Sequence, residues 1–334
     1  MANPATVALV GSESLLGREV RDVAATLDPG FALRLIAAGE EEANRITRQG
    51  DEAAIVSDLT EDNLAGAHVI VLAGPAESSH QTLELCGDTP VIDLTGALED
   101  RADARLRAPA VESDAEPEMG AGAVHIVAHP AAIAVALFLR RLQANFPIRR
   151  AVVEVLLPAS ERGAAGVEEL QQQTVNLLSF KSLPKAVFDA QIGFNLLARY
   201  GEEAPVSLED TELRIERHLA TLLALAGDGE GAPLPSLRAV QAPVFHGCSI
   251  SAWVEFESSP GVDVLEETLA TGLIEVRGPD VEPPTNVGCA GQSGIAVGAI
   301  TPDRNEAEAC WFWLVSDNLR LAAENAVALA RQLV

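Results

Sequence analysis

The sequence has little positive charge. Its 334 residues include 23 lysines and arginines against 49 aspartates and glutamates, which gives a formal net charge of −26. Only Lys181 and Lys185 are lysines, a bias to which we attach no functional meaning. A surface this acidic repels nucleic-acid phosphates and anionic lipids, so we expect no nucleic acid and no membrane among the partners.

Cysteines and long apolar runs are also scarce. No CxxC pair or other regular metal-ligand spacing occurs among the four cysteines, Cys86, Cys248, Cys289 and Cys310, and this favours a reducing compartment. The longest nearly apolar run, about 126–139, is shorter than the ~20 residues of a membrane-spanning helix. The N-terminus leads into an apolar strand without a basic region, so we expect no signal peptide and a cytoplasmic location.

The remaining composition is typical of a globular protein, with 48% hydrophobic and 22% charged residues. A chain of this length usually forms two domains, because single cores stop growing near about 250–300 residues. In the first part of the chain, apolar strands alternate with helical stretches. This pattern predicts a parallel, doubly wound sheet, whose ligand crevice lies at the C-terminal ends of the strands. The predicted strands cover 7–10, 33–36, 69–72, 91–94 and 124–127, and the first helix covers 15–27.

After Pro130 the pattern changes. Long strands and intervening helices predict an α+β domain with an antiparallel sheet. The predicted strands are 151–157, 240–245, 249–256 and 295–300, with a further strand-like aromatic stretch around 311–313. The predicted helices are 131–142, 167–178, 211–226 and 318–333, and a loop covers 227–235.

A candidate nucleotide loop lies between the first strand and the first helix, where a helix N-terminus attracts a pyrophosphate. Its glycines, Gly11 and Gly17, are separated by five residues. Ser14 stands where a middle glycine would help, and Glu13 brings a negative charge toward the phosphates. A tight turn without a ligand explains the same residues equally well. The loop residues that we assign to cofactor binding are Gly11, Ser12, Ser14, Leu15, Leu16 and Gly17.

The end of the second strand carries the segment 37–42, which ends in three glutamates. An NADP 2′-phosphate needs an arginine or lysine at this point, whereas NAD favours a carboxylate. The glutamates therefore disfavour NADP and leave NAD possible. We prefer an alternative interpretation, in which this run is the solvated start of a helix. Glutamates there interact favourably with the helix dipole.

Several motifs together resemble the aspartate-β-semialdehyde dehydrogenases, and the similarity covers nearly the whole chain. Their order and spacing carry the resemblance more than any single motif does. The motifs are 315–320 (VSDNLR) leading into 325–327 (NAV), 243–247 (PVFHG) with Ser249, 91–93 (VID), and 163–166 (GAAG) with 168–170 (EEL).

The resemblance implies a Rossmann-type nucleotide-binding domain over 1–130 and an α+β catalytic-like and dimerisation domain over 131–316. It also implies that the helix in 317–334 returns to the first domain, that the protein is a homodimer, and that Ala38, Gly74 and Asn318 join the cofactor site. Members of the family make aspartate semialdehyde from aspartyl phosphate with NADPH. Their chemistry uses a cysteine thiolate as nucleophile and a histidine as acid and base.

The positions that match the family's catalytic set hold other residues here. A methyl group stands at the nucleophile position, and the two substrate arginines are replaced by an amide and by a carboxylate of the wrong charge. The nucleophile, glutamine, arginine and histidine positions are held by Ala132, Leu157, Gln241 and Cys248, and the second anion-binding arginine position by Glu99.

A relocated pair of Cys248 and His129 is conceivable, because an adjacent base activates a thiol. His246 and Cys248 offer two metal ligands on one predicted strand, but no third ligand is evident, so we expect no metal. A buried cysteine that acts as a small hydrophobe explains position 248 better. We therefore predict a non-catalytic, regulatory or nucleotide-sensing protein that forms homodimers or mixed dimers with an active paralogue. The alternatives are an active aspartate-semialdehyde dehydrogenase or related NAD(P)-dependent oxidoreductase, and a ligand-free dimeric scaffold.

Overall fold

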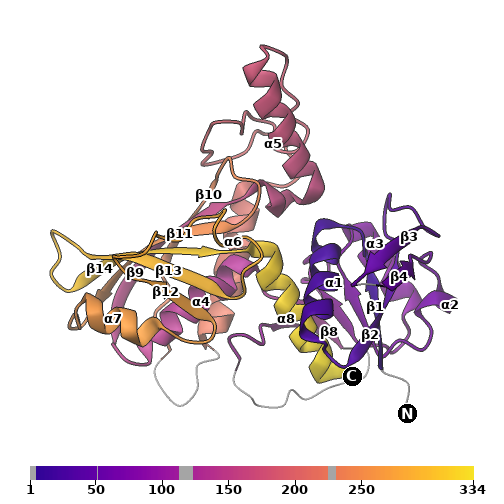
Figure 1. The fold of residues 1–334 in the computed structure, drawn as a ribbon, viewed down its shortest axis with the longest axis horizontal. Helices are drawn as coiled ribbons and strands as arrows, with labels where there is room; N and C mark the ends of the chain where they lie inside the picture. Colours follow the sequence, from indigo (N-terminus) through magenta and orange to yellow (C-terminus); the bar gives the residue numbers. More distant parts are fainter. Residues whose placement is uncertain (1–4, 51, 113–122, 225–230) are drawn as a thin grey trace. The chain divides into compact units, whose positions relative to one another are not determined.

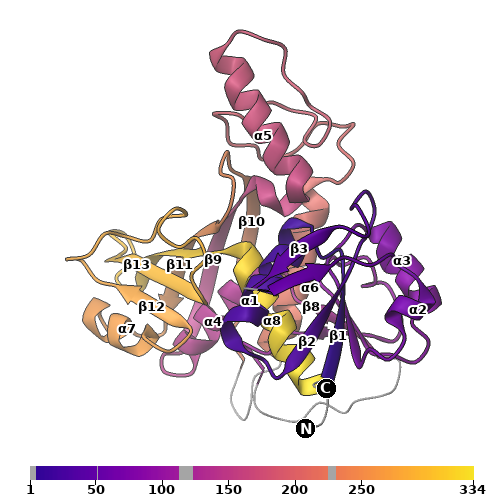
Figure 2. The same cartoon turned by 45° about the vertical axis from the view of Figure 1, so that its right-hand side comes forward.

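The computed structural model describes residues 5–50, 52–112, 123–224 and 231–334. Contacts divide the chain into two compact units. The first unit comprises 1–128 and 322–334, and the second comprises 129–321 (Figures 1 and 2). Each unit has its own six-stranded sheet, which confirms the predicted α/β class.

The first unit contains a fully parallel sheet, as its short apolar strands predict. Strands with four buried residues in a row need cover on both faces, which a doubly wound arrangement provides. The strand order is β2 (Phe31–Ile36), β1 (Ala5–Val10), β5 (Val69–Leu72), β6 (Val91–Asp93), β8 (Val124–Val127) and β7 (Ala104–Arg107). The helices are α1 (Leu15–Leu27), α2 (Glu61–Leu64) and α3 (Ala76–Leu85).

This unit also contains an antiparallel hairpin that was not predicted from the sequence, formed by β3 (Ile46–Gln49) and β4 (Glu52–Ile55). The hairpin forms a separate two-stranded sheet. The side chains of Ile46 and Ile55 are 72% and 63% exposed. Neither strand therefore buries an apolar face, and the alternation that reveals a strand in a sequence is absent.

The sheet of the second unit is mixed, so the expectation of an antiparallel sheet is wrong. Two of its pairs, β10 with β9 and β12 with β13, are parallel. The order is β10 (Ser236–Gln241), β9 (Ile148–Leu157), β11 (Cys248–Phe256), β14 (Ala309–Ser316), β13 (Ile295–Pro302) and β12 (Ile274–Arg277).

The predicted strand 240–245 is shifted in the structure, because β10 ends at Gln241. Pro243 has no N–H group to give to a sheet ladder, which fits this early end. The predicted loop 227–235 and the helix 211–226 lie partly outside the described residues, and the described part of that helix is α6 (Leu208–Ala224). The unit's other helices are α4 (Pro130–Gln143), α5 (Gly163–Leu178) and α7 (Val262–Leu269), with a short 3-10 turn at Ala159–Arg162.

The helix α8 (Asn318–Leu333) has the predicted bounds. Its first residues belong to the second unit and the rest to the first. In the first unit, Asn325 Oδ1 accepts a hydrogen bond of 3.0 Å from the N–H of Ala110, and Gln332 Oε1 accepts one of 3.0 Å from Arg107. These contacts tie the end of the chain to the segment after β7. Among the described residues, no helix combines the length and apolarity needed to cross a bilayer.

Candidate functional site

Close backbone packing shapes the β1–α1 loop. Gly11 has φ +83°, and a Cβ added there would lie 2.3 Å from the backbone nitrogen of Gly74. A Cβ at Gly17 would lie 2.0 Å from the carbonyl oxygen of Gly11. Only glycine fits either position, because a side chain would push the start of α1 away from the loop. Both glycines thus have a structural reason to be present, whether or not a ligand binds.

The same loop keeps hydrogen-bond donors that the protein does not use. Ser14 caps α1, since its Oγ accepts from the N–H of Gly17 at 2.9 Å and donates to the carbonyl of Ala73 at 2.7 Å. Within the described part of the chain, the N–H groups of Leu15 and Leu16 find no acceptor, and the buried Oγ of Ser12 has no partner. Free N–H groups at a helix N-terminus are the donors that a phosphate needs.

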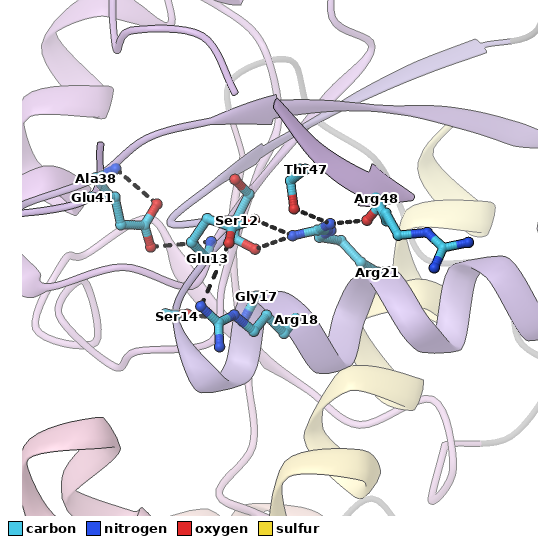
Figure 3. Close-up of polar contacts among 10 residues, drawn as sticks. All are labelled: Ser12, Glu13, Ser14, Gly17, Arg18, Arg21, Ala38, Glu41, Thr47 and Arg48. Atoms are coloured by element: carbon cyan, nitrogen blue, oxygen red, sulfur yellow. Dashed lines mark hydrogen bonds and ion pairs between the residues drawn. The ribbon is translucent and has the colours of Figure 1, made fainter. Parts of the chain in front are cut away.

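The acidic run after β2 does not begin a helix, so that interpretation is wrong. Residues 39–44 form turns, and Glu41 is partly buried. Its carboxylate accepts hydrogen bonds of 3.2 Å from the N–H groups of Glu13 and Ala38 (Figure 3). Burial raises the pKa of Glu41, and these backbone hydrogen bonds oppose the rise. A carboxylate therefore lies against the loop at the point where β2 ends.

The negative charge of Glu13 is neutralised by arginines from α1. Its carboxylate pairs with the buried Arg21 and, at 3.5 Å, with Arg18. Figure 3 shows that Arg21 also reaches the β3–β4 hairpin, where it donates to Thr47 Oγ1 at 3.0 Å and to the carbonyl of Arg48. From the sequence, we expected Glu13 to bring an unpaired charge toward bound phosphates. These partners were not predicted, although Arg18 and Arg21 follow on the first helix.

The structure brings most of the assigned cofactor residues together. Gly74 lies against Gly11, and a Cβ on Gly74 would lie 2.6 Å from the Cβ of Ala38. Asn318, however, belongs to the second unit. Its Oδ1 accepts from the N–H of Gly247 at 3.0 Å, and its amide exchanges hydrogen bonds with Ser160 Oγ. Its polar atoms are thus engaged within that unit.

In the second unit, the residues at the family's catalytic positions are closed off from solvent. Ala132 lies in the first turn of α4, Leu157 ends β9, Gln241 ends β10 and Cys248 begins β11. None is more than 1% exposed. The remaining position, Glu99, lies in a turn after β6 in the first unit.

The Gln241 side chain is fully used inside the protein. Its Oε1 accepts from the Tyr200 hydroxyl at 2.6 Å, and its Nε2 donates to the carbonyls of Leu157 at 2.8 Å and Ala242 at 3.0 Å. Because both amide protons and the amide oxygen already have partners, Gln241 ties β10 to β9 and has no donor left for an anionic substrate.

The thiol of Cys248 is not activated. Burial raises its pKa strongly, and the negative charge of Glu161 adds to the rise. Since the thiolate is the reactive form, such a thiol is inert. The expectation that His246 and Cys248 lie on one strand is wrong, because β11 begins at Cys248 and His246 lies in the preceding bend. Across the described ranges, no group of three or more histidine, cysteine or acidic side chains is placed to hold a metal ion.

His129 is engaged with Glu161. Its Nδ1 accepts from the N–H of Ala131 at 3.1 Å, which leaves the proton on Nε2, and Nε2 donates to Glu161 Oε1 at 2.9 Å. The backbone N–H of His129 donates to His218 Nδ1 at 2.9 Å. Both ring nitrogens of His129 therefore have partners, and neither partner is Cys248.

Glu161 is the centre of this cluster, and the sequence analysis missed it. Its side chain is 12% exposed. Burial acts to raise its pKa, but the contact with His129 and the charges of Arg162 and Arg214 lower it to about 2. The Arg162 guanidinium lies 5.5 Å from the centre of the Tyr200 ring. The signal in the sequence was a charged pair, 161–162, placed soon after a buried strand.

Known proteins resemble the chain over its full length. The family model for the semialdehyde dehydrogenase dimerisation domain matches residues 139–321. A USG-1 protein homolog of Pseudomonas aeruginosa is 32% identical, covering 100% of this chain and 99% of its own, and an aspartate-semialdehyde dehydrogenase of Rickettsia bellii is 26% identical with the same coverage. The solved structure of a probable aspartate-semialdehyde dehydrogenase from Pseudomonas aeruginosa superimposes with a TM-score of 0.84 at 30% identity, covering 99% of this chain and 98% of that one.

Proposed function

The chain belongs to the semialdehyde dehydrogenase family, and we propose that within it the protein binds a nucleotide and does not form aspartate semialdehyde. One observation carries the proposal. Ala132 stands in the first turn of α4, where the resemblance places the nucleophile, and the thiol of Cys248 is buried with a raised pKa. The cluster around Glu161 thus lacks an ionisable thiol for covalent catalysis.

Substrate recognition is missing for a separate reason. An acyl phosphate and its carboxylate are held best by arginines in bidentate geometry. Gln241 stands at the family's arginine position, and its amide groups are bonded to Tyr200 and to two backbone carbonyls. A side chain with no free donor cannot orient the substrate, and orientation supplies a large part of the rate enhancement.

Nucleotide binding is supported by the β1–α1 loop. The free N–H groups of Leu15 and Leu16 at the start of α1 fit a pyrophosphate. The carboxylate of Glu41 at the end of β2 favours the ribose hydroxyls of NAD and repels the extra phosphate of NADP. A bound nicotinamide would supply hydride chemistry, but here we propose that the nucleotide is the signal that the protein senses.

Dimer formation is supported by an apolar patch in the region that matches the dimerisation domain. Figures 1 and 2 show α5 extending away from the sheet of the second unit. We define the dimer patch by the exposed apolar side chains of α5 and of the segment that follows it, which are Val175, Leu178, Phe180, Phe194 and Leu196, exposed by 54%, 71%, 99%, 66% and 59%. We propose that the patch forms a homodimer in the cytoplasm, and that it also allows mixed dimers with an active paralogue.

The decisive experiment measures turnover and binding on the same purified protein. We expect no reduction of NAD or NADP in the presence of aspartate semialdehyde and phosphate, with an active member of the family as positive control. Calorimetric titration should show that NAD binds and that NADP binds more weakly. Turnover would contradict the loss of catalysis, and the absence of any nucleotide binding would leave a scaffold.

Restoring the nucleophile and the histidine should not restore activity. The double variant A132C/C248H should remain inactive, because Gln241 still occupies the place of the substrate arginine. Robust turnover by this variant would contradict the importance that we give to substrate positioning.

Dimerisation is tested by light scattering, in which F180D should shift the protein toward monomers and K181A, at an exposed neighbouring position, should not.

A further inference from the structure

A cavity in the first unit lies beside the nucleotide loop. Its volume is about 640 Å³, and it is formed by α1 on one side and by the β3–β4 hairpin on the other. Four arginines line it against two carboxylates, although the whole chain has more than twice as many acidic as basic residues. The lining residues named in this argument are Glu13, Arg18, Arg21, Arg45, Thr47 and Arg48.

Arg21 builds this cavity from within. It is 8% exposed, and it connects α1 to the hairpin through Thr47 Oγ1 and the carbonyl of Arg48 (Figure 3). Its buried Nε has no partner among the residues described. A guanidinium placed in this way fixes the width of the cavity and leaves one buried donor unused.

The other three arginines are available to a ligand. Arg18, Arg45 and Arg48 are exposed. Arg18 pairs only loosely with Glu13, at 3.5 Å, and neither Arg45 nor Arg48 forms an ion pair with any described residue. The positive charges of arginines around one cavity repel one another, which costs folding free energy. A bound anion would offset this repulsion.

We propose that this arginine pocket binds a phosphate-bearing small molecule, at a site separate from the nucleotide loop. A phosphate group carries up to two negative charges on three terminal oxygens, and planar guanidinium groups match those oxygens pairwise. A carboxylate would satisfy only one or two of the arginines. The volume is of the size that small-molecule sites usually have.

The opposite sides of Glu13 keep the two sites apart. Its backbone N–H faces Glu41, whereas its side chain faces Arg18 and Arg21 (Figure 3). A phosphate in the arginine pocket would compete with the Glu13 carboxylate for Arg18. Binding there would loosen one contact of the nucleotide loop, which gives the pocket a route by which it influences nucleotide binding.

The test is a calorimetric titration with inorganic pyrophosphate on protein saturated with NAD, so that the nucleotide loop is already occupied. The wild-type protein should bind it, and R45A/R48A should bind it at least tenfold more weakly. The matched control R199A/R304A removes two exposed arginines from the second unit and should bind it as the wild type does. If the wild type does not bind pyrophosphate, or if R45A/R48A binds it equally well, the proposal is overturned.

A comparison of NAD with NADP identifies the source of the phosphate. If pyrophosphate binds equally well with NADP present, the pocket takes a free phosphorylated metabolite, as we propose. If pyrophosphate competes with NADP but not with NAD, the pocket takes the cofactor's own 2′-phosphate, and the claim of a separate site is overturned.

NAD binding by R45A/R48A should stay within about twofold of wild type, so a failure of the pocket is distinguishable from a failure of nucleotide binding. R45K/R48K should retain part of the pyrophosphate affinity, because the charge remains while the bidentate geometry is lost.

Discussion

The β1–α1 loop and the cluster around Glu161 both lie at the ends of strands, but they use their polar groups in opposite ways. In the loop, the N–H groups of Leu15 and Leu16 and the Oγ of Ser12 have no partner among the described residues. In the cluster, the ring of His129 and the amide of Gln241 are fully hydrogen-bonded inside the protein.

This difference in the use of polar groups supports the proposal that the protein binds a nucleotide without catalysis. Unused donors cost stability unless a ligand or water satisfies them, so their presence in the loop favours continued binding. A catalytic site also needs unused groups, because they must meet the substrate. Around Glu161 the polar groups bond within the protein, which stabilises the fold and supports the proposed loss of catalysis.

The strongest way to break the comparison is to remove the centre of the cluster. E161A should lower the free energy of unfolding by about 3–5 kcal/mol, because it removes the carboxylate that pairs with the buried His129 and with nearby arginines. The pKa of Glu161 is depressed to about 2, so its stabilisation is present above about pH 4.5 and is lost as the pH falls toward 2. Denaturant unfolding measures both effects. E168A, on the exposed face of α5, is the control, and unchanged NAD binding by E161A would show that the two sites are independent.

Next in size is a change in the loop itself. G17A should cost about 3 kcal/mol and abolish NAD binding, because the new methyl group would overlap the carbonyl of Gly11. The control is G272A, since Gly272, like Gly17, does not have positive φ but has no atom within 4 Å of its missing Cβ. A similar loss in both variants, measured by thermal unfolding and calorimetry, would mean that the overlap with the carbonyl of Gly11 is not responsible.

A third prediction concerns pH and the first unit. His125 is 1% exposed, and both its ring nitrogens lack a partner in the described part of the chain. Burial, aided by Arg107 and Arg105, lowers its pKa to about 4. The unfolded chain therefore binds a proton at higher pH than the folded one does, and roughly 2–3 kcal/mol of stability is lost as the pH falls from about 6.5 to 4. H125L should flatten this part of the stability curve, whereas H80Q, at an exposed histidine, should leave it unchanged.

The smallest expected effect comes from Y200F. It removes the hydrogen bond to Gln241 Oε1 but keeps the ring beside Arg162, so we expect a loss of about 1 kcal/mol. Tryptophan fluorescence during denaturation measures it. A loss near zero would mean that the Gln241 amide is satisfied in another way, and the contrast between the two sites would weaken.

Much of the fold was predictable because its strands and helices carry strong apolar patterns. Five of the six parallel strands of the first unit contain apolar runs and were predicted, and α8 has the predicted bounds. The strand β7 was not predicted, because arginines alternate with its apolar residues. The β3–β4 hairpin was not predictable, because Ile46 and Ile55 are exposed and no buried face marks its strands.

The candidate sites were predictable in position but not in chemistry. Glycine spacing located the β1–α1 loop, and the motif order located Gln241 and Cys248. The sequence could not reveal that Glu41 bends back to the N–H of Glu13, or that His129 pairs with Glu161. Both contacts join residues about 30 positions apart, and only the folded chain determines such distances.

The hairpin beyond β2 is an attachment to the first unit and lies outside its main sheet. Because Arg21 links it to α1, the residues at its outer positions can change without disturbing the parallel sheet. Substitutions in the hairpin could therefore alter which anion the proposed arginine pocket binds, while the parallel sheet stays the same. Specificity would then drift independently of folding, through substitutions on four-residue strands.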